Sequence, residues 1–157
     1  MATLTAARAA STFPVASAAT KGVLQVAWGT YTLTAALTAN DIIEFCRVPK
    51  GATIIGGYVQ AKDIDTGTEA FDFDIGWAGN GTEAADPDGL GNLGQWDGDA
   101  VAFLRPEAGN YYPLGGTLYT SGPQSFSAET VIQGVCNVAA NAGGTGNITV
   151  VVFYTVA

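Results

Sequence analysis

Short apolar runs separated by Gly, Pro, Asn and Asp follow one another along the chain, and none keeps the 3.6-residue period of an amphipathic helix. Such runs are typical of β-strands joined by turns. The pattern predicts an all-β sandwich or barrel, and among these a single jelly-roll-like β-sandwich, the usual arrangement of about eight strands. The expected strands are residues 23–33, 41–48, 52–61, 70–77, 100–104, 116–120, 129–138 and 147–156.

The alternation is strictest in residues 70–77, where large apolar side chains alternate with acidic residues or glycine. Because successive side chains of a strand point to opposite faces, one face is predicted to be buried and the other exposed. Asp72 and Asp74 belong to the face that is predicted to be exposed. The side chains that are predicted to be buried are Phe71, Phe73, Ile75 and Trp77.

Residues 23–33 also alternate, and Leu24, Val26 and Trp28 share the face that we expect to be buried. After Gly29 the apolar positions move by one residue. A change of parity at a glycine predicts a β-bulge.

Two further features concern how the strands are placed. Pro49 has no N–H to donate to a sheet and Gly51 tolerates an unusual backbone, so a tight corner is predicted between the second and third strands. Residues 147–156 are apolar on both faces, which predicts a central strand that is covered on both sides.

Residues 1–20 consist mostly of Ala, Ser and Thr. They offer little to bury, so we expect an extended N-terminal arm before a sandwich domain at residues 21–157, with a short Ala-rich helix as the alternative for the arm. Phe13, Pro14 and Val15 form a small apolar cluster in the arm. Because Pro14 favours extended backbone and lacks an N–H, these three residues are predicted to bind a partner at a strand edge or in a groove.

The chain has 157 residues and a formal net charge of −8. Ten acidic residues and no basic residue lie between positions 63 and 99. Nucleic acids and anionic membranes both require a basic surface, so neither is an expected partner. The sequence shows no convincing signal peptide and no apolar run long enough for a membrane span, so synthesis in a cytoplasm is expected.

Histidine is absent, which removes the commonest general base and the commonest transition-metal ligand. Pairs of carboxylates can hydrolyse glycosides, but strand alternation already explains Asp72 and Asp74. We therefore expect no catalytic residues, no cofactor, no metal and no enzyme activity. The segments 63–69 and 86–92 carry oxygen ligands at alternating positions, so a structural calcium site is the alternative to ordinary turns.

The spacing of Cys46 and Cys136 fits no metal or redox motif. Two buried thiols are expected, and a single disulfide is the alternative. Trp28 and Trp77 are expected in the core, because they share a face with apolar neighbours. Trp96 lies within the Gly- and Asp-rich segment 78–99, which is predicted to be a long loop, and is therefore expected to be exposed.

Residues 35–90 carry a recurring pattern. A strand that begins at Asn40-Asp41 leads to the corner Pro49-Lys50-Gly51-Ala52; a later strand closes with Asp74-Ile75-Gly76, and the loop after it contains Asp86-Pro87-Asp88. This pattern resembles small structural proteins of tailed-bacteriophage heads, among them the capsid decoration, or cement, proteins.

The resemblance implies a jelly-roll-like sandwich that forms a homo-oligomer, most simply a trimer. It also implies attachment to the outer surface of the phage head, with the major capsid protein as partner, and assembly in the bacterial host cytoplasm. The alternative function is a carbohydrate- or receptor-binding β-sandwich module of a phage fibre or spike. That module would bind through exposed aromatic residues of the kind expected at Trp96, Tyr111 and Tyr112.

Overall fold

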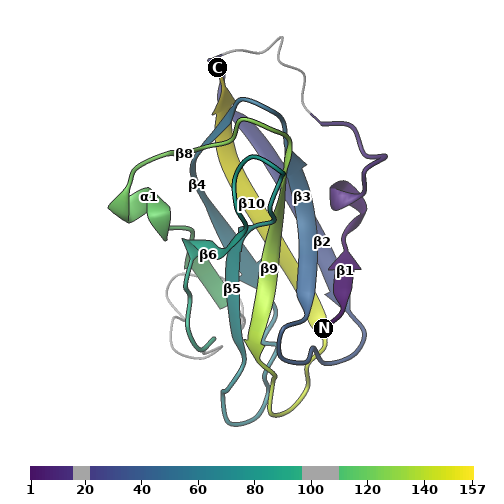
Figure 1. Cartoon of the computed structure of the whole chain (residues 1–157). Helices are drawn as coiled ribbons and strands as arrows, with labels where there is room; N and C mark the ends of the chain where they lie inside the picture. The colour runs from purple at the N-terminus through teal and green to yellow at the C-terminus, as the bar shows by residue number, and fades with distance from the viewer. Residues whose placement is uncertain (16–21, 97–109) are drawn as a thin grey trace.

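Two β-sheets pack face to face in the computed structural model, which describes residues 1–15, 22–96 and 110–157 (Figure 1). All strand pairs are antiparallel except that of the first strand with the third. The elements are β1 (Thr3–Thr5), the 3-10 helix η1 (Ala7–Ala9), β2 (Gln25–Leu33), β3 (Ile42–Val48), β4 (Ala52–Ala61), β5 (Asp72–Trp77), β6 (Asp86–Gly91), β7 (Asn110–Pro113), α1 (Thr117–Thr120), β8 (Gln124–Ser125), β9 (Thr130–Val138) and β10 (Gly146–Val156).

The strand order confirms the all-β, jelly-roll-like prediction. Sheet A has the order β1-β3-β9-β5-β6, and sheet B has the order β2-β10-β4-β7, with β8 paired to β4. Without the short strands β1 and β8, eight strands remain. Numbered along the chain, these eight strands lie in the order 1-8-3-6 in sheet B and 2-7-4-5 in sheet A. This is the strand order of a jelly roll, in which two Greek keys interlock. β10 lies between β2 and β4, so the prediction of a central strand is also confirmed.

The corner at residues 49–51 carries the chain from sheet A to sheet B. The Pro49 carbonyl accepts a hydrogen bond from the Ala52 N–H at 3.1 Å. Gly51 has a φ of 82°, a left-handed conformation that a residue with a side chain adopts only at a cost. The corner thus ends β3 in sheet A and begins β4 in sheet B, which packs against sheet A.

The buried face of β5 is confirmed, because Phe71, Phe73, Ile75 and Trp77 are all buried. Trp96 joins this core with only 1% of its surface exposed, so its predicted exposure is wrong. The reason is backbone pairing beside β5. The Trp96 N–H donates to the Phe71 carbonyl at 2.7 Å, and its indole N–H donates to the Phe73 carbonyl at 2.9 Å.

The predicted exposure of Asp74 is also wrong. The segment after β6 covers the outer face of β5, where Asp74 accepts hydrogen bonds from the Leu93 N–H at 2.9 Å and the Asn137 amide at 2.7 Å. Burial raises the pKa of Asp74, although these two donors act in the opposite direction. Asp72, its neighbour on the same face, stays half-buried.

The face of β2 is the reverse of the predicted one. Val26 and Trp28 point outwards, and Trp28 is 41% exposed. The pairing of β2 with β10 is continuous, so the predicted β-bulge is absent. Gly29 has another role: a Cβ at this position would collide with the carbonyl oxygen of Phe45, so glycine allows β2 to approach β3 closely.

Two further segments differ from the predicted elements. Residues 116–120 were expected as a strand, but α1 occupies them, because no neighbouring strand pairs with this short segment. The loop expected at residues 78–99 contains β6, which gains its hydrogen bonds by pairing with β5. The strand expected at residues 100–104 lies outside the described residues.

Both cysteines are buried free thiols, as expected, so the alternative of a disulfide is wrong. Burial raises the pKa of Cys46 to about 12 and that of Cys136 to about 11. Since the thiolate is the reactive form, neither side chain is a nucleophile near neutral pH.

Candidate interaction surface

The described part of the N-terminal arm, residues 1–15, lies along the edge of the sandwich beside β2 and β3 (Figure 1). β1 pairs in parallel with β3, with Thr3 opposite Ile42. Asp41 fixes the start of this pairing, because its carboxylate accepts hydrogen bonds from the N–H groups of Thr38, at 2.9 Å, and Ala2, at 2.7 Å. These donors hold the pKa of Asp41 below its usual range. The division of the chain into an arm at 1–20 and a domain at 21–157 stays a prediction.

Arg8 joins the arm to sheet B. Its guanidinium carbon lies 3.8 Å from the centre of the Trp28 ring and 4.9 Å from that of Phe13. A cation between two aromatic rings is attracted by both, by about 0.5–1 kcal/mol for each exposed pair. The arm therefore contacts sheet A through its backbone and sheet B through this side chain.

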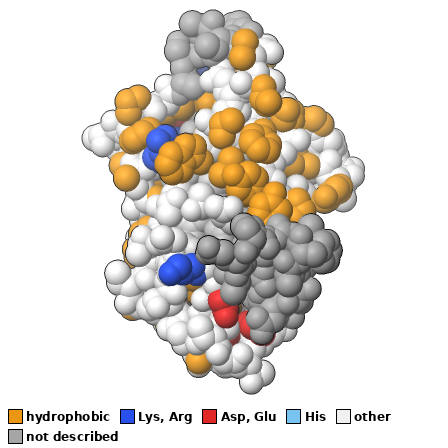
Figure 2. Space-filling model, turned by 180° about the vertical axis from the view of Figure 1, so that it is seen from behind, with side chains coloured by type: hydrophobic (Ala, Val, Ile, Leu, Met, Phe, Trp, Pro, Cys, Tyr) orange, Lys and Arg blue, Asp and Glu red, His pale blue; other side chains and the backbone are white. Residues whose placement is uncertain are grey.

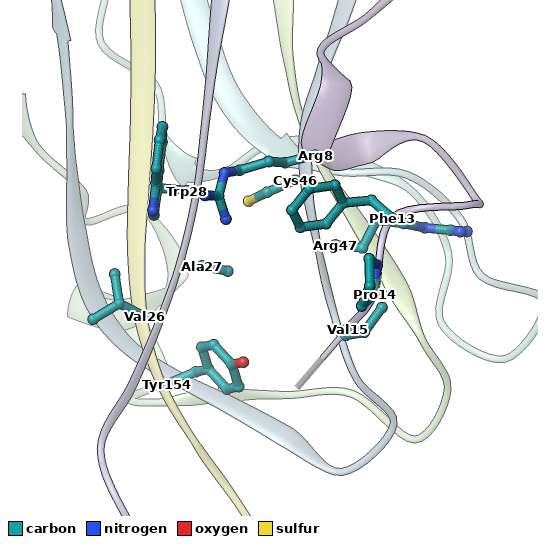
Figure 3. A pocket seen from close by; sticks show the side chains of 10 residues that line it. All are labelled: Arg8, Phe13, Pro14, Val15, Val26, Ala27, Trp28, Cys46, Arg47 and Tyr154. Atoms are coloured by element: carbon teal, nitrogen blue, oxygen red, sulfur yellow. The ribbon is translucent and has the colours of Figure 1, made fainter. Parts of the chain in front are cut away.

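A pocket of about 80 Å³ opens between the arm and β2. Phe13, Pro14 and Val15 lie along one side of it, and Val26 and Trp28 lie on the other (Figure 3). The structure thus brings the three residues predicted to bind a partner next to two exposed apolar residues of β2. Arg8, Ala27, Cys46, Arg47 and Tyr154 complete the lining. Whether the predicted three bind a partner stays a prediction.

Beyond the pocket, apolar side chains continue across the outer face of sheet B. Figure 2, seen from this side, shows hydrophobic side chains gathered over one half of the face. Tyr58 on β4 stacks on Tyr111 of β7 at 5.3 Å between ring centres and meets Phe153 of β10 edge-on at 6.2 Å. This surface was not predicted, because Val26 and Trp28 were expected in the core. The feature of the sequence that indicates this surface is the absence of charged residues from these strands.

The acidic segments serve the fold. Asp65, expected in a turn or a calcium site, is 2% exposed and accepts hydrogen bonds from five backbone N–H groups, those of Gly67, Ala70, Phe71, Asn141 and Ala142. Burial alone would raise its pKa, but these donors lower it below the usual value. Within the described ranges, no three His, Cys, Asp or Glu side chains are grouped in a way that could hold a metal ion.

The arrangement is suited to binding. Its side chains are apolar, aromatic or cationic, and they come from the arm, from β2 and β10 of sheet B and from β3 of sheet A. Of the aromatic residues expected at a sugar-binding loop, Trp96 is buried, and Tyr111 and Tyr112 are half-buried. Among the helices that the structure describes, none has the length and apolar character needed to cross a bilayer.

Comparison with known proteins finds similarity in structure alone. No family model matches the chain, and no curated protein matches its sequence. The structure is similar to a chain in the capsid of Ralstonia phage GP4, with 18% identity, 99% of both chains covered and a TM-score of 0.75. It is also similar to chains in the capsid asymmetric unit of cyanophage Pam1 and in the acid-stable capsid of Helicobacter pylori bacteriophage KHP30.

The Pam1 and KHP30 chains match with lower TM-scores than the GP4 chain. The Pam1 chain is 19% identical, with 87% of both chains covered and a TM-score of 0.63. The KHP30 chain is 13% identical, with 85% of this chain and 89% of that chain covered and a TM-score of 0.52. The protein thus has a fold that occurs in phage capsids. This agrees with the sequence resemblance and is consistent with a structural protein of a phage head.

Proposed function

We propose that this chain is a capsid decoration, or cement, protein that binds the outer surface of a phage head. In this role it stabilises the shell by bridging subunits of the major capsid protein. The observation that carries the proposal is the match to a chain of the GP4 capsid over 99% of both chains, at a TM-score of 0.75. The similarity therefore extends over both sheets of the sandwich and is not limited to one part of it.

Charge and chemistry support this role. An acidic chain of net charge −8 is repelled by packaged DNA. The electrostatic free energy of the protein is therefore lower outside the shell than inside it. The carboxylates of Asp41 and Asp65 accept hydrogen bonds from backbone N–H groups, and these bonds lower the pKa of both side chains. The lowered pKa values are therefore explained by hydrogen bonds that hold the fold together. We infer that the protein is structural rather than catalytic, and that it works as a homo-oligomer, most simply a trimer.

The arm supplies the proposed contact with the major capsid protein. Phe13 and Pro14 are exposed and Val15 is half-buried, and all three border the pocket beside Trp28. A partner's apolar side chain would pack on these three residues of the arm. Apolar anchors in pockets contribute most of the binding energy in protein interfaces.

The double substitution Phe13→Ala with Val15→Ala tests this role. We expect the apparent Kd for phage heads that lack the protein to rise at least about tenfold, since two apolar contacts are lost. The measurement is co-sedimentation of the purified protein with such heads. Ser11→Ala with Thr12→Ala is the matched control, because both residues are exposed in the same arm and leave the apolar cluster intact.

Two outcomes contradict the proposal at different levels. If the double variant binds heads as tightly as the wild type, attachment does not use these residues. If the wild type stays in the supernatant and instead binds immobilised glycans, the protein is a carbohydrate-binding module and the cement role is wrong.

A further inference from the structure

Sheet B is built without charge. None of its five strands, β2, β4, β7, β8 and β10, contains an Asp, Glu, Lys or Arg residue. The strands of sheet A contain Glu44, Arg47, Asp72, Asp74, Asp86 and Asp88. In a chain of net charge −8, the face of sheet B is therefore where a like-charged surface can approach with the least repulsion.

One half of this face is apolar and already ordered. Trp28, Val151 and Tyr58 lie opposite one another on three neighbouring strands, and Val26 lies opposite Phe153. The Tyr58 ring contacts the rings of both Phe153 and Tyr111. We call Val26, Trp28, Ile55, Tyr58, Tyr111 and Phe153 the apolar face. Two of these side chains are largely exposed, Val26 at 52% and Ile55 at 48%.

The other half of the sheet is neutral, and its polar groups are paired with each other. The Thr30 and Thr149 hydroxyl groups hydrogen-bond at 2.7 Å, and the Thr32 hydroxyl donates to the Asn147 amide oxygen at 2.7 Å. A partner that covers this half therefore leaves few of its polar groups without hydrogen bonds. A partner can therefore cover these four residues at little cost in hydrogen bonds.

We propose that the apolar face packs against a second copy of this chain, so that sheet B forms the contact between copies in the oligomer. This inference rests on the proposed homo-oligomeric cement protein and names its interface. Permanent contacts between identical chains are rich in aromatic and aliphatic residues and poor in charge, whereas interfaces with separately folded partners resemble ordinary surface.

A second copy of the chain would also shield the apolar face from solvent before any shell is assembled. A contiguous exposed apolar face favours aggregation of the free chain. A copy of the same chain is present as soon as the protein folds, whereas an assembled shell is not. Each copy offers the same apolar face, and three such faces that converge on a three-fold axis would bury one another, as the proposed trimer requires.

The test is sedimentation velocity of the purified full chain, without capsids, over a range of concentrations. We expect the wild type to be oligomeric. Val26→Glu and Ile55→Glu each place a carboxylate in the apolar face, and each should raise the Kd between copies at least about 100-fold, because an unpaired charge is then buried. Val138→Glu is the matched control, since Val138 on β9 of sheet A is 47% exposed, and its oligomer should be unchanged.

Far-UV circular dichroism separates loss of contact from loss of fold, and both sheet B variants should keep the wild-type β spectrum. A monomeric wild type, or sheet B variants as oligomeric as Val138→Glu, overturns the inference. Head binding is measured on the same preparations. A monomeric wild type that binds heads overturns the interface but not the cement role; an oligomer that depends on sheet B but ignores heads supports the interface and contradicts the cement role.

Discussion

Phe73→Ala is expected to lower the free energy of unfolding by about 3–5 kcal/mol, as truncation of a buried aromatic residue does. Phe73 is fully buried at the centre of a ring cluster. Its ring lies 5.6 Å from that of Trp96, 5.7 Å from that of Phe71 and 6.3 Å from that of Phe45. The substitution leaves a cavity that the three surrounding rings cannot easily fill. Chemical denaturation followed by tryptophan fluorescence measures the change.

Asp72→Ala is the control for Phe73→Ala, because the two residues are adjacent on β5 and point to opposite faces. Asp72 is half-buried and accepts one hydrogen bond, from the Asn137 amide at 3.0 Å. We expect a loss well under about 1 kcal/mol. If Asp72→Ala proves the more damaging of the two, the assignment of the β5 faces is wrong.

Asp65→Ala is expected to cost about 3 kcal/mol, since five backbone N–H groups lose a charged acceptor in a buried setting. The carboxylate joins the segment before β5 to the loop between β9 and β10. Thr68→Ala is the control, because this side chain is exposed in the same segment. Thermal or urea unfolding of both variants measures the difference; equal stabilities would show that water replaces the carboxylate at little cost.

The same substitution should show a defined pH dependence. The pKa of Asp65 is lower in the folded protein than its ordinary value of 3.8, so its stabilising effect is fully present above that value and is lost as the pH falls through the folded pKa. The difference in stability between the wild type and Asp65→Ala should therefore be constant near neutral pH and shrink below about pH 4. A difference that grows on acidification would contradict the assignment.

Much of the fold could be predicted because local signals and long-range pairing agree. β3, β4, β5, β9 and β10 begin and end within about two residues of the predicted strands, since turn residues flank short apolar runs there. β6 could not be predicted in the same way, because Asp-Pro-Asp-Gly has no strand propensity and pairs only where β5 offers an edge. The strand predicted at residues 116–120 is wrong for the opposite reason: the segment carries a weak apolar pattern, but no strand of the two described sheets pairs with it.

The surface was harder to predict than the core. Val26 and Trp28 alternate with Ala27 and Gly29, and they were expected in the core because they share a face with each other and with Leu24. The structure turns them outwards because Gly29 must pass close to Phe45, which fixes the small residues on the inner face. Such a contact between strands of different sheets leaves no periodic signal in the sequence. Phe13, Pro14 and Val15 stand out in a low-complexity arm, and their role in binding stays a prediction.

The most direct test of the cement role is a cryo-EM reconstruction of heads of the phage that encodes this chain, compared with heads that lack it. We predict additional density on the outer surface that fits the jelly-roll-like domain and spans boundaries between major capsid protein subunits. Heads without the protein should lose this density and release their DNA at a lower temperature. Density for the domain at the tail tip or inside the shell, or identical shells with and without the protein, would contradict the account.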